Sequence, residues 1–550
     1  MYATVMTGAL HGFHSFLAQV EVDCSRGLPG FEMVGLLGSE VKEARERIRV
    51  ALRNAGVELP PMRITVNISP ASLHKEGTSY DLPVAVGILA AQGLIPQEYV
   101  EKTLIAGELS LNGEVRPVCG ILPMALEAGR QGIRRCLIPE KNVDEACLAA
   151  GMEGIGIRHL EEVSLLLAPG NGGKGRRGKS VSDSSRTRPD SGAAASAPDF
   201  GEVRGQEGAK RAALAAAAGG HHMLMVGPPG AGKTMIARAI PSILPPLSEE
   251  EMLEAASIYS VAGILPESLL KEGRRPFVSP HHTLTGHALT GGGRIPKPGA
   301  VSLAHKGILF LDELTEFCRS TLDLLRQPLE EKQVCIARNS GTYVYPADFM
   351  LVGAMNPCPC GYYPDKNRCR CTPSQVRRYL ERVSGPILDR MDICTEVVRV
   401  PFEELMGRVL RQGTGHAAEM KERYGGTACM ADGLEEAGAG AEGLDSRRMR
   451  EAVMEARERQ KHRLAGAGLH CNAQMGPAQL KEFCALGMEE QNYLEELFGL
   501  LQLTARSCHR LLRVARTLAD LEGAQKIGRL HLSEAACYRM ADGKYWGGEA

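Results

Sequence analysis

The sequence predicts a multidomain α/β protein that ends in a helical region. Three observations indicate this fold class: a length of 550 residues, strand-like and helical segments that alternate along most of the chain, and long helical windows near the carboxyl end. Because single cores stop growing at about 250 to 300 residues, we expect roughly two to four folded units. Hydrophobic residues make up 44% and charged residues 23%, which is the balance of a globular protein and excludes a fibrous or wholly disordered one.

Residues 1–168 are expected to form a mixed α/β domain. The segments 64–69 and 103–111 alternate apolar and polar side chains, which is typical of half-buried strands. The segments 81–93 and 121–132 instead have helical apolar spacing, and each ends at a glycine. Strands and helices therefore follow one another within this domain.

Two stretches of low complexity divide the rest of the chain. Residues 169–199 are rich in Gly, Ser and Pro and carry an excess of Lys and Arg, so they predict a flexible basic linker, with a nucleic-acid-binding arm as the alternative. Residues 200–400 are expected to form an α/β core. Residues 401–550 are expected to be helical, with a surface insertion near 416–445.

The strongest motif is a glycine-rich loop that follows the apolar segment 223–226 and precedes a helical pattern. In such a loop, backbone N–H groups converge on phosphate oxygens, the lysine reaches the β and γ phosphates, and the threonine hydroxyl binds Mg²⁺. The motif therefore predicts a nucleotide site. The residues predicted to bind the nucleotide are Gly227, Pro228, Pro229, Gly230, Ala231, Gly232, Lys233 and Thr234.

A second apolar segment, 307–311, ends in two acidic residues. Asp312 is predicted to bind the nucleotide-associated Mg²⁺ together with Thr234, and Glu313 to polarise the attacking water as a general base. Adjacent carboxylates at the end of a buried strand are costly without such a role. The pair therefore favours ATP hydrolysis over nucleotide storage.

Three further residues complete the predicted catalytic set, and with them the order of motifs resembles the AAA+ ATPases. Asn356 ends a third apolar segment, at the place that this family calls sensor 1, although Asn before Pro by itself is typical of a turn. Arg390 resembles the arginine finger that reaches the nucleotide of a neighbouring subunit, and a local ion pair with Asp389 or Asp392 is the alternative. Arg506 matches the sensor 2 position.

Two insertions resemble those of the magnesium chelatase and replicative helicase branch of AAA+ proteins. One is the glycine-rich segment before Asp312, and the other is a pair of strands around Asn339-Ser340-Gly341. In such rings these loops can face a central pore. Lys297 and Arg338 are therefore candidate contacts for a nucleic-acid backbone, and packing between subunits is the alternative.

The chain as a whole resembles the YifB/ComM-type magnesium chelatase-like ATPases. The segments that carry the resemblance include VKEARERIRVALRNAG, GGHHMLMVGPPGAGKT, ILFLDELTEF and AMNPCPCGYY. The resemblance implies a Lon-protease-like domain, an AAA+ P-loop core with a parallel sheet, and a helical lid. It also implies a homo-hexamer that uses ATP and Mg²⁺ to drive branch migration of recombining DNA. A chelatase-like ATPase that remodels a protein and does not act on DNA is the alternative.

The Lon-like resemblance invites a protease interpretation, which the residues argue against. Lon proteases use a Ser-Lys dyad. Ser79 stands near the nucleophile position, but Leu122 stands where the lysine belongs. A serine hydroxyl without a base is a poor nucleophile at neutral pH, so we expect Ser79 to be structural. The domain is then expected to bind DNA or to order the ring.

Four cysteines form two Cys-x-Cys pairs separated by eight residues. Thiolates suit Zn²⁺, and one ion could close this short loop, with reduced thiols or a redox pair as the alternative. The cysteines are Cys358, Cys360, Cys369 and Cys371. Basic residues around them, which make this region a candidate nucleic-acid contact, are Lys366, Arg368, Arg370, Arg377, Arg378 and Arg382.

The chain carries no strong overall charge. Lys and Arg total 64 against 65 Asp and Glu, so a DNA partner must meet a local basic surface. The sequence has no apolar window of about 20 residues and its first residues lack the pattern of a signal peptide. We therefore expect a cytoplasmic protein without a membrane partner.

Overall fold

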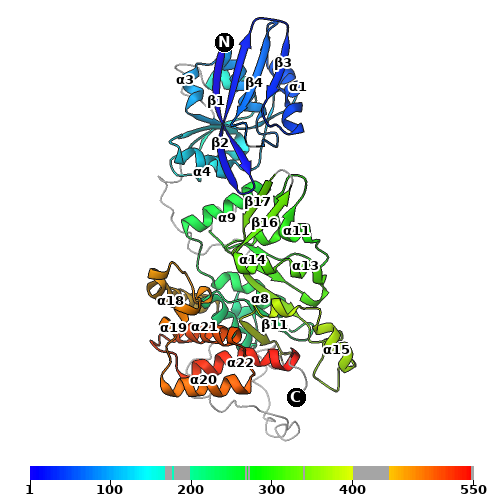
Figure 1. Cartoon of the computed structure of the whole chain (residues 1–550), viewed down its shortest axis with the longest axis vertical. Coiled ribbons are helices and arrows are strands. Elements are labelled where there is room, and N and C mark those ends of the chain that lie inside the picture. Colours follow the sequence, from blue (N-terminus) through cyan, green and yellow to red (C-terminus); the bar gives the residue numbers. More distant parts are fainter. Residues whose placement is uncertain are drawn as a thin grey trace, which may run out of the picture.

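A computed structural model of the chain describes residues 1–72, 74–166, 176–178, 198–266, 269, 273–338, 341–400 and 445–546. The amino-terminal sheet lies at one end of an elongated arrangement and the carboxyl-terminal helices lie at the other (Figure 1). Most of the predicted insertion near 416–445 lies outside the described residues, as do Asn339 and Ser340 of the predicted hairpin tip.

The amino-terminal part is built on a mixed sheet of eight strands in the order β10-β9-β8-β5-β1-β2-β4-β3. Its longest pair, β1 and β2, is antiparallel, with Tyr2 opposite Asp23 and His11 opposite His14. The strands are β1 (Tyr2–His11), β2 (His14–Ser25), β3 (Gly30–Val34), β4 (Arg63–Ser69), β5 (Thr103–Ile105), β8 (Arg135–Pro139), β9 (Glu153–Ile157) and β10 (Arg176–Gly178).

Helices pack on this sheet where apolar spacing predicts them. The helix α2 is almost wholly buried, which explains why its sequence is apolar on every side. The helices of this part are α1 (Ser39–Asn54), α2 (Asp81–Ala91), α3 (Gln97–Glu101), α4 (Ile121–Arg130), α5 (Val143–Ala146) and α6 (Glu161–Leu166).

One prediction for this part needs correction, and one strand lies in a segment predicted as a linker. The predicted strand over 103–111 is interrupted, because Gly107 turns to exchange backbone hydrogen bonds with Ser79 and Leu82 at the start of α2, and β6 (Glu108–Leu109) then pairs with β7 (Val115–Arg116). Within the segment predicted as a linker, β10 forms three antiparallel pairs with β9. The open edge of β9 offers unpaired backbone groups, which even a polar segment can satisfy.

The central part is a parallel sheet of five strands in the order β12-β15-β18-β11-β19. Three of its strands, β11, β15 and β18, are buried at every residue, as expected for a parallel sheet covered on both faces. The strands are β11 (Met223–Val226), β12 (Phe277–Val278), β15 (Ile308–Leu311), β18 (Met350–Met355) and β19 (Ile393–Glu396).

Helices and two small hairpins surround this sheet. Because all five strands run in one direction, the loops after β11, β15 and β18 meet at a single edge. The helices are α7 (Glu207–Gly219), α8 (Lys233–Ile243), α9 (Glu249–Ala262), α11 (Gly286–Thr290), α12 (Ala300–Leu303), α13 (Arg319–Asp323), α14 (Arg326–Glu331), α15 (Pro373–Leu380) and α16 (Gly385–Leu388). The hairpins are β13 (Gly291–Gly292) with β14 (Lys297–Pro298), and β16 (Gln333–Arg338) with β17 (Gly341–Pro346).

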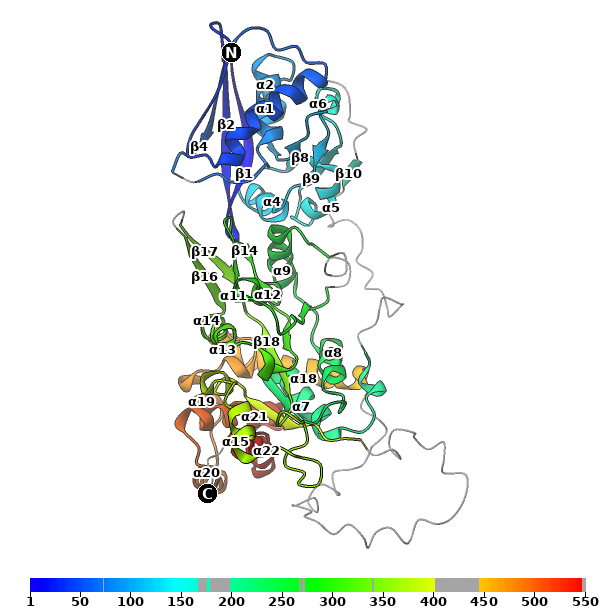
Figure 2. The same cartoon turned by 90° about the vertical axis from the view of Figure 1, so that its right-hand side faces the viewer.

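The amino-terminal and central parts are in contact at several places, including an ion pair of Arg294 with Glu40 at 3.3 Å, and two of these places lie at elements labelled in Figure 2. At the first, the tip of the β1–β2 hairpin meets β17, where the His11 ring stacks on Tyr343 with centroids 4.4 Å apart. At the second, α4 packs against α9 and the N–H of Gly120 donates to Ser260 O at 3.0 Å. The predicted hairpin β16–β17 is thus in contact with the amino-terminal part.

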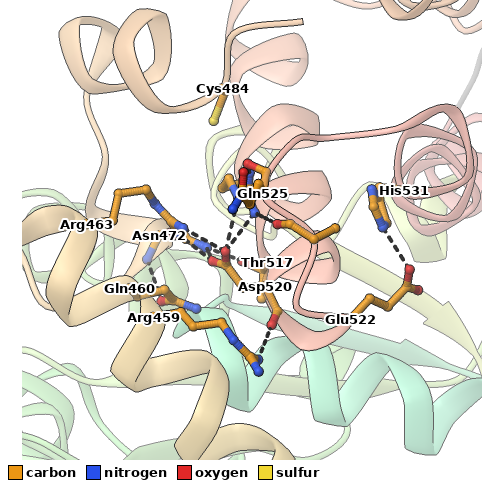
Figure 3. A network of polar contacts seen from close by, with 12 residues as sticks. Arg459, Gln460, Arg463, Asn472, Cys484, Thr517, Asp520, Glu522, Gln525 and His531 are labelled. Carbon is orange, nitrogen blue, oxygen red and sulfur yellow. Dashed lines mark hydrogen bonds and ion pairs between the residues drawn. The ribbon is translucent and has the colours of Figure 1, made fainter.

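The carboxyl-terminal part is helical and shares a core with the central sheet. This part contains a buried carboxylate, that of Asp520, whose side chain is 1% exposed. It accepts hydrogen bonds from Arg463 and Asn472 (Figure 3). The helices are α18 (Ser446–Leu464), α19 (Pro477–Phe483), α20 (Met488–Leu500), α21 (Ala505–Leu521) and α22 (Arg529–Trp546). Across the stretches that the structure describes, none of the helices is both long and apolar enough to span a bilayer.

Candidate nucleotide site

The glycine-rich loop connects β11 to α8 and needs glycine at three positions for two physical reasons. A Cβ atom on Gly227 would lie 2.1 Å from the Val397 oxygen, so no larger residue fits beside the end of β19. Gly230 and Gly232 have φ angles of 73° and 92°, a region that other residues rarely adopt. The loop can therefore fold tightly before α8 begins.

Lys233 lies at the first turn of α8 and its ammonium group is buried under the loop. It donates hydrogen bonds to Gly227 O at 2.7 Å, to Pro228 O at 2.9 Å and to Asn356 Oδ1 at 3.0 Å. Burial lowers the pKa of Lys233 to about 8, although two nearby carboxylates act in the opposite direction. The structure thus brings the predicted lysine and the predicted sensor 1 residue into direct contact.

Thr234 and Asp312 also meet at this edge of the sheet. The Thr234 hydroxyl donates to Asp312 Oδ2 at 2.7 Å, and the other carboxylate oxygen accepts from the N–H of Glu313 at 3.0 Å. A hydroxyl beside a carboxylate is the oxygen ligand set that Mg²⁺ prefers next to phosphates. The residues present therefore fit the predicted magnesium ion.

Glu313 has an unusual backbone conformation and a partner that the sequence analysis did not name. Its φ angle is 51°, its side chain is 57% exposed, and it forms an ion pair with His282 Nδ1 at 3.3 Å. Such a left-handed conformation is costly for a residue with a Cβ, and strained residues of this kind cluster at functional sites. No spacing in the sequence relates His282 to Glu313, because they are brought together only by the fold.

Arg390 lines a cavity of about 220 Å³, to which no residue of the glycine-rich loop contributes. Its guanidinium group donates to Pro386 O and forms an ion pair with Glu330, so the predicted alternative pairing with Asp389 or Asp392 does not occur. Asp392 pairs instead with His221 at 3.2 Å. Arg390 thus forms a local ion pair, but its partner is Glu330 and neither of the two predicted aspartates.

Arg506 lies in the same cavity as Arg390. Its guanidinium group is 3.7 Å from Glu330, the carboxylate that Arg390 also contacts. The charged residues that line the cavity are the arginines Arg390, Arg506, Arg510 and Arg513 and the acids Glu330, Asp389 and Asp392. Burial and the positive charges of Arg506 and Arg326 lower the pKa of Arg390, as expected where cations outnumber anions.

The basic region after the cysteines contains a second and larger cavity, of about 500 Å³. Arg319 and Arg378 line it without an ion pair to any residue that the structure describes, whereas Arg382 pairs with Glu316 at 3.3 Å. Arg377 is not part of this lining and pairs with Glu381 at 3.0 Å. Arg378 and Arg382 are among the candidate nucleic-acid contacts predicted from the sequence. Arg319, which comes from the segment after Glu313, is not among them.

The two positions of the Lon dyad have different surroundings. Ser79 is buried in the amino-terminal part, whereas Leu122 packs against Ala255, Ala256 and Leu269 of the central part. Leu122, which stands in the lysine's place, therefore packs at the contact between the amino-terminal and central parts.

Comparison with known families assigns the class of this protein. The model of the magnesium chelatase subunit ChlI matches residues 199–405, that of the ChlI subunit of Mg-chelatase matches 20–142, and that of the ChlI C-terminal region matches 443–539. A parallel sheet with a glycine-rich loop, followed by helices, is thus the framework of a magnesium chelatase-like protein.

Individual relatives define the family more closely. The protein named uncharacterized protein YifB from Escherichia coli is 41% identical over 540 residues, covering 98% of this chain and 97% of the relative. Competence protein ComM from Haemophilus influenzae is 39% identical over 538 residues, with the same coverage. Lon protease 2 from Bacillus subtilis is 31% identical over 128 residues, which is 23% of this chain and 22% of the relative. The chain belongs to the YifB/ComM family of magnesium chelatase-like proteins.

Proposed function

We propose that this protein is a Mg²⁺-dependent AAA+ ATPase that acts as a homo-hexamer and couples ATP hydrolysis to movement along DNA, including branch migration in recombination. The observation that carries the ATPase proposal is the meeting of Lys233, Asn356 and the Thr234–Asp312 pair at one edge of the parallel sheet. We also propose the division into a Lon-like domain (1–168), a linker (169–199), an ATPase core (200–400) and a helical lid (401–550).

The residues of the site have separate roles in this proposal. The loop N–H groups and Lys233 would hold the phosphates, and Thr234 and Asp312 would hold Mg²⁺, which supplies positive charge to the transferred phosphoryl group. Glu313 would accept a proton from the attacking water while Asn356 orients that water.

Hydrolysis is proposed to require two subunits. Among the described residues, Arg390 is bonded to Glu330 and Pro386, and neither belongs to the glycine-rich loop. Arg506 shares Glu330 with it, so the two arginines form one cationic site on the surface of the cavity. We infer that this site reaches the γ-phosphate bound by the next subunit, where it would stabilise transition-state charge.

DNA is the proposed substrate because three basic features could contact its backbone. Lys297 and Arg338 are exposed on the hairpins β13–β14 and β16–β17, and Arg319 and Arg378 line the larger cavity without an ion pair to any described residue. The name of the relative, competence protein ComM, also favours a role in DNA uptake. The alternative is a remodelling ATPase that acts on a protein partner and not on DNA.

Substitution of Glu313 by Gln tests the ATPase proposal. The amide keeps the side-chain shape but cannot accept the proton, so we expect kcat to fall by about 100-fold or more while ATP still binds. ATP turnover and nucleotide affinity would be measured on the same preparation, with Glu451→Gln on the exposed face of α18 as the control. Turnover close to that of the unchanged protein would contradict the role of Glu313.

Addition of DNA separates the two candidate functions. We expect a synthetic four-way junction to stimulate ATP turnover, and we expect the stimulation to fall steeply as salt rises, because phosphate contacts release counterions. ATP-dependent conversion of the junction to product duplexes would be followed on a gel. An ATPase that ignores DNA at every salt concentration would favour the remodelling alternative.

A further inference from the structure

The four cysteines of the loop between β18 and α15 have the arrangement of a tetrahedral metal site. Their Sγ atoms all lie within 4.8 Å of one another, and three of the separations are 3.3, 3.6 and 3.8 Å. Four thiolates at about 2.3 Å from one Zn²⁺ ion lie about 3.8 Å apart. The separations are also far longer than the bond of about 2.05 Å in a disulfide.

Polar and basic groups lie close to the cysteines. The N–H of Tyr363 donates to Cys358 Sγ at 3.3 Å, an outer hydrogen bond that would orient this sulfur as a metal ligand. Three exposed basic residues in the same loop can offset the net negative charge of a zinc ion with four thiolates. They are Lys366, Arg368 and Arg370.

The cysteine loop rests directly on the glycine-rich loop of the nucleotide site. Gly361 has a φ angle of 84°, and a Cβ atom there would lie 2.5 Å from Pro229 Cδ. The cysteine loop also starts only two residues after Asn356, whose side chain holds Lys233. One short segment therefore touches the nucleotide site at two points.

A second contact fixes the other side of the cysteine loop. The Arg399 guanidinium group lies 5.4 Å from the centre of the Tyr362 ring and donates to its hydroxyl oxygen at 3.2 Å. Arg399 comes just after Val397, the residue whose oxygen closely approaches Gly227. The cysteine loop is thus packed between the glycine-rich loop and the segment that follows β19.

We propose that Cys358, Cys360, Cys369 and Cys371 bind one zinc ion, and that the zinc-bound loop positions the nucleotide site through Gly361 and Pro229. The loop has no large apolar core of its own, so the ion supplies the constraint that holds Gly361 against Pro229. Gly361 is then a positioning residue for ATP, since it acts through Pro229. This second half of the proposal rests on the proposed ATPase function, whereas zinc binding does not.

Metal analysis of the full-length protein tests the zinc site. We expect about one zinc per chain after incubation with zinc and removal of the excess, and a loss of most of it in Cys369→Ser. Cys335→Ser, which changes an exposed cysteine on β16, is the matched control and should keep its zinc. A wild-type zinc content near zero, bound iron in place of zinc, or equal losses in both variants would overturn the site.

Two glycine substitutions with the same backbone conformation test the coupling. Gly361→Ala should raise the KM for ATP about tenfold with a smaller effect on kcat, because the added Cβ displaces Pro229 while the zinc content stays unchanged. Gly132→Ala is the matched control, since Gly132 also has a φ angle of 84° but no atom within 4 Å of the added Cβ. Equal KM values for the two variants would overturn the coupling.

The outcomes for zinc and for ATP are separable. Cys369→Ser should show the same rise in KM as Gly361→Ala, which reports on the coupling even if Gly361→Ala does not fold. Circular dichroism of each variant would confirm that it folds. A protein that binds zinc but neither binds nor hydrolyses ATP would overturn the proposed ATPase, and with it the coupling, while the metal site would stand.

Discussion

Helix α21 carries two arginine clusters that differ in the acidic residues beside them. In the first, Arg516 of α21 and Arg463 of α18 both bind the carboxylate of Asp520. Asn472 also donates to this carboxylate at 2.8 Å, and Figure 3 shows Arg463, Asn472 and Asp520 together. In the second, three arginines of α21 join Arg390 around the smaller cavity, where four arginines face three acids. They are Arg506, Arg510 and Arg513.

We propose that the difference separates arginines that stabilise the fold from arginines that serve the ATPase site on the same helix. A buried carboxylate with several charge-assisted hydrogen bonds holds α18 and α21 together, and its removal would leave two arginines without their counter-charge. In the cavity the cations are in excess, and the acid Asp392 is already engaged by His221. Repulsion between these arginines destabilises the single chain, and a bound anion would offset that repulsion.

The largest expected effect is that of Arg390→Ala on ATP turnover. If Arg390 stabilises the transition state of a neighbouring subunit, kcat should fall by about 1000-fold while the protein still folds and binds ATP. Steady-state turnover and nucleotide affinity would be measured at concentrations where rings form. Arg447→Ala, on the exposed face of α18, is the control and should keep full activity. Unchanged turnover of Arg390→Ala would remove the distinction between the two clusters.

A large effect on stability is expected for Asp520→Asn. Loss of the negative charge leaves Arg463 and Arg516 facing a neutral amide, so the free energy of unfolding should fall by roughly 2 to 4 kcal/mol. Urea unfolding followed by circular dichroism would measure it. Glu522→Gln is the control, because the Glu522 side chain is 49% exposed and its loss should cost less than about 1 kcal/mol. Similar losses in the two variants would count against the network.

The smallest expected effect is a dependence of protein stability on pH that arises from His222, which lines the smaller cavity. Burial lowers the pKa of His222, and its Nδ1 accepts a hydrogen bond from the N–H of Leu351 at 3.0 Å. The unfolded chain then binds a proton near pH 6.5 that the folded chain binds only at lower pH. Stability should therefore fall as pH drops below about 6.5, by at most about 1.4 kcal/mol per pH unit. The charged groups that act on His222 are Asp392, Asp348, His221 and Lys332.

The variant His222→Asn isolates this contribution. Its side-chain oxygen can accept the same N–H but does not titrate, so the variant should lose less stability than the wild type between pH 7.5 and 5.5. Urea unfolding at several pH values would compare the two slopes. Parallel slopes would show that His222 does not control the pH dependence.

Much of the fold and site could be predicted because the signals are local. The glycine-rich loop is contiguous, and the strand that ends at Asp312 is a short apolar run with a clear limit. The strand predicted over 103–111 failed because its alternation says nothing of the backbone bonds that Gly107 makes with Ser79. Hydrophobic periodicity indicates which face of a strand is buried, but it does not indicate which distant group will accept a hydrogen bond from a backbone N–H.

The residues missed by the sequence analysis are those that act across space. His282 beside Glu313 and Glu330 between Arg390 and Arg506 have no spacing that relates them to their partners. Arg319 is separated by many residues from Arg378, with which it lines the larger cavity. A single sequence carries no signal for such pairs.

The sequence by itself determined the α/β class, the family resemblance and the order of the motifs, because each depends on residues close together in the chain. Only the tertiary structure decided that Asn356 holds Lys233, that Arg390 and Arg506 share one acid, and that Gly361 rests on Pro229. These contacts depend on the order of the parallel strands and on how the helices pack against them, and side chains far apart in sequence meet only when that packing is complete.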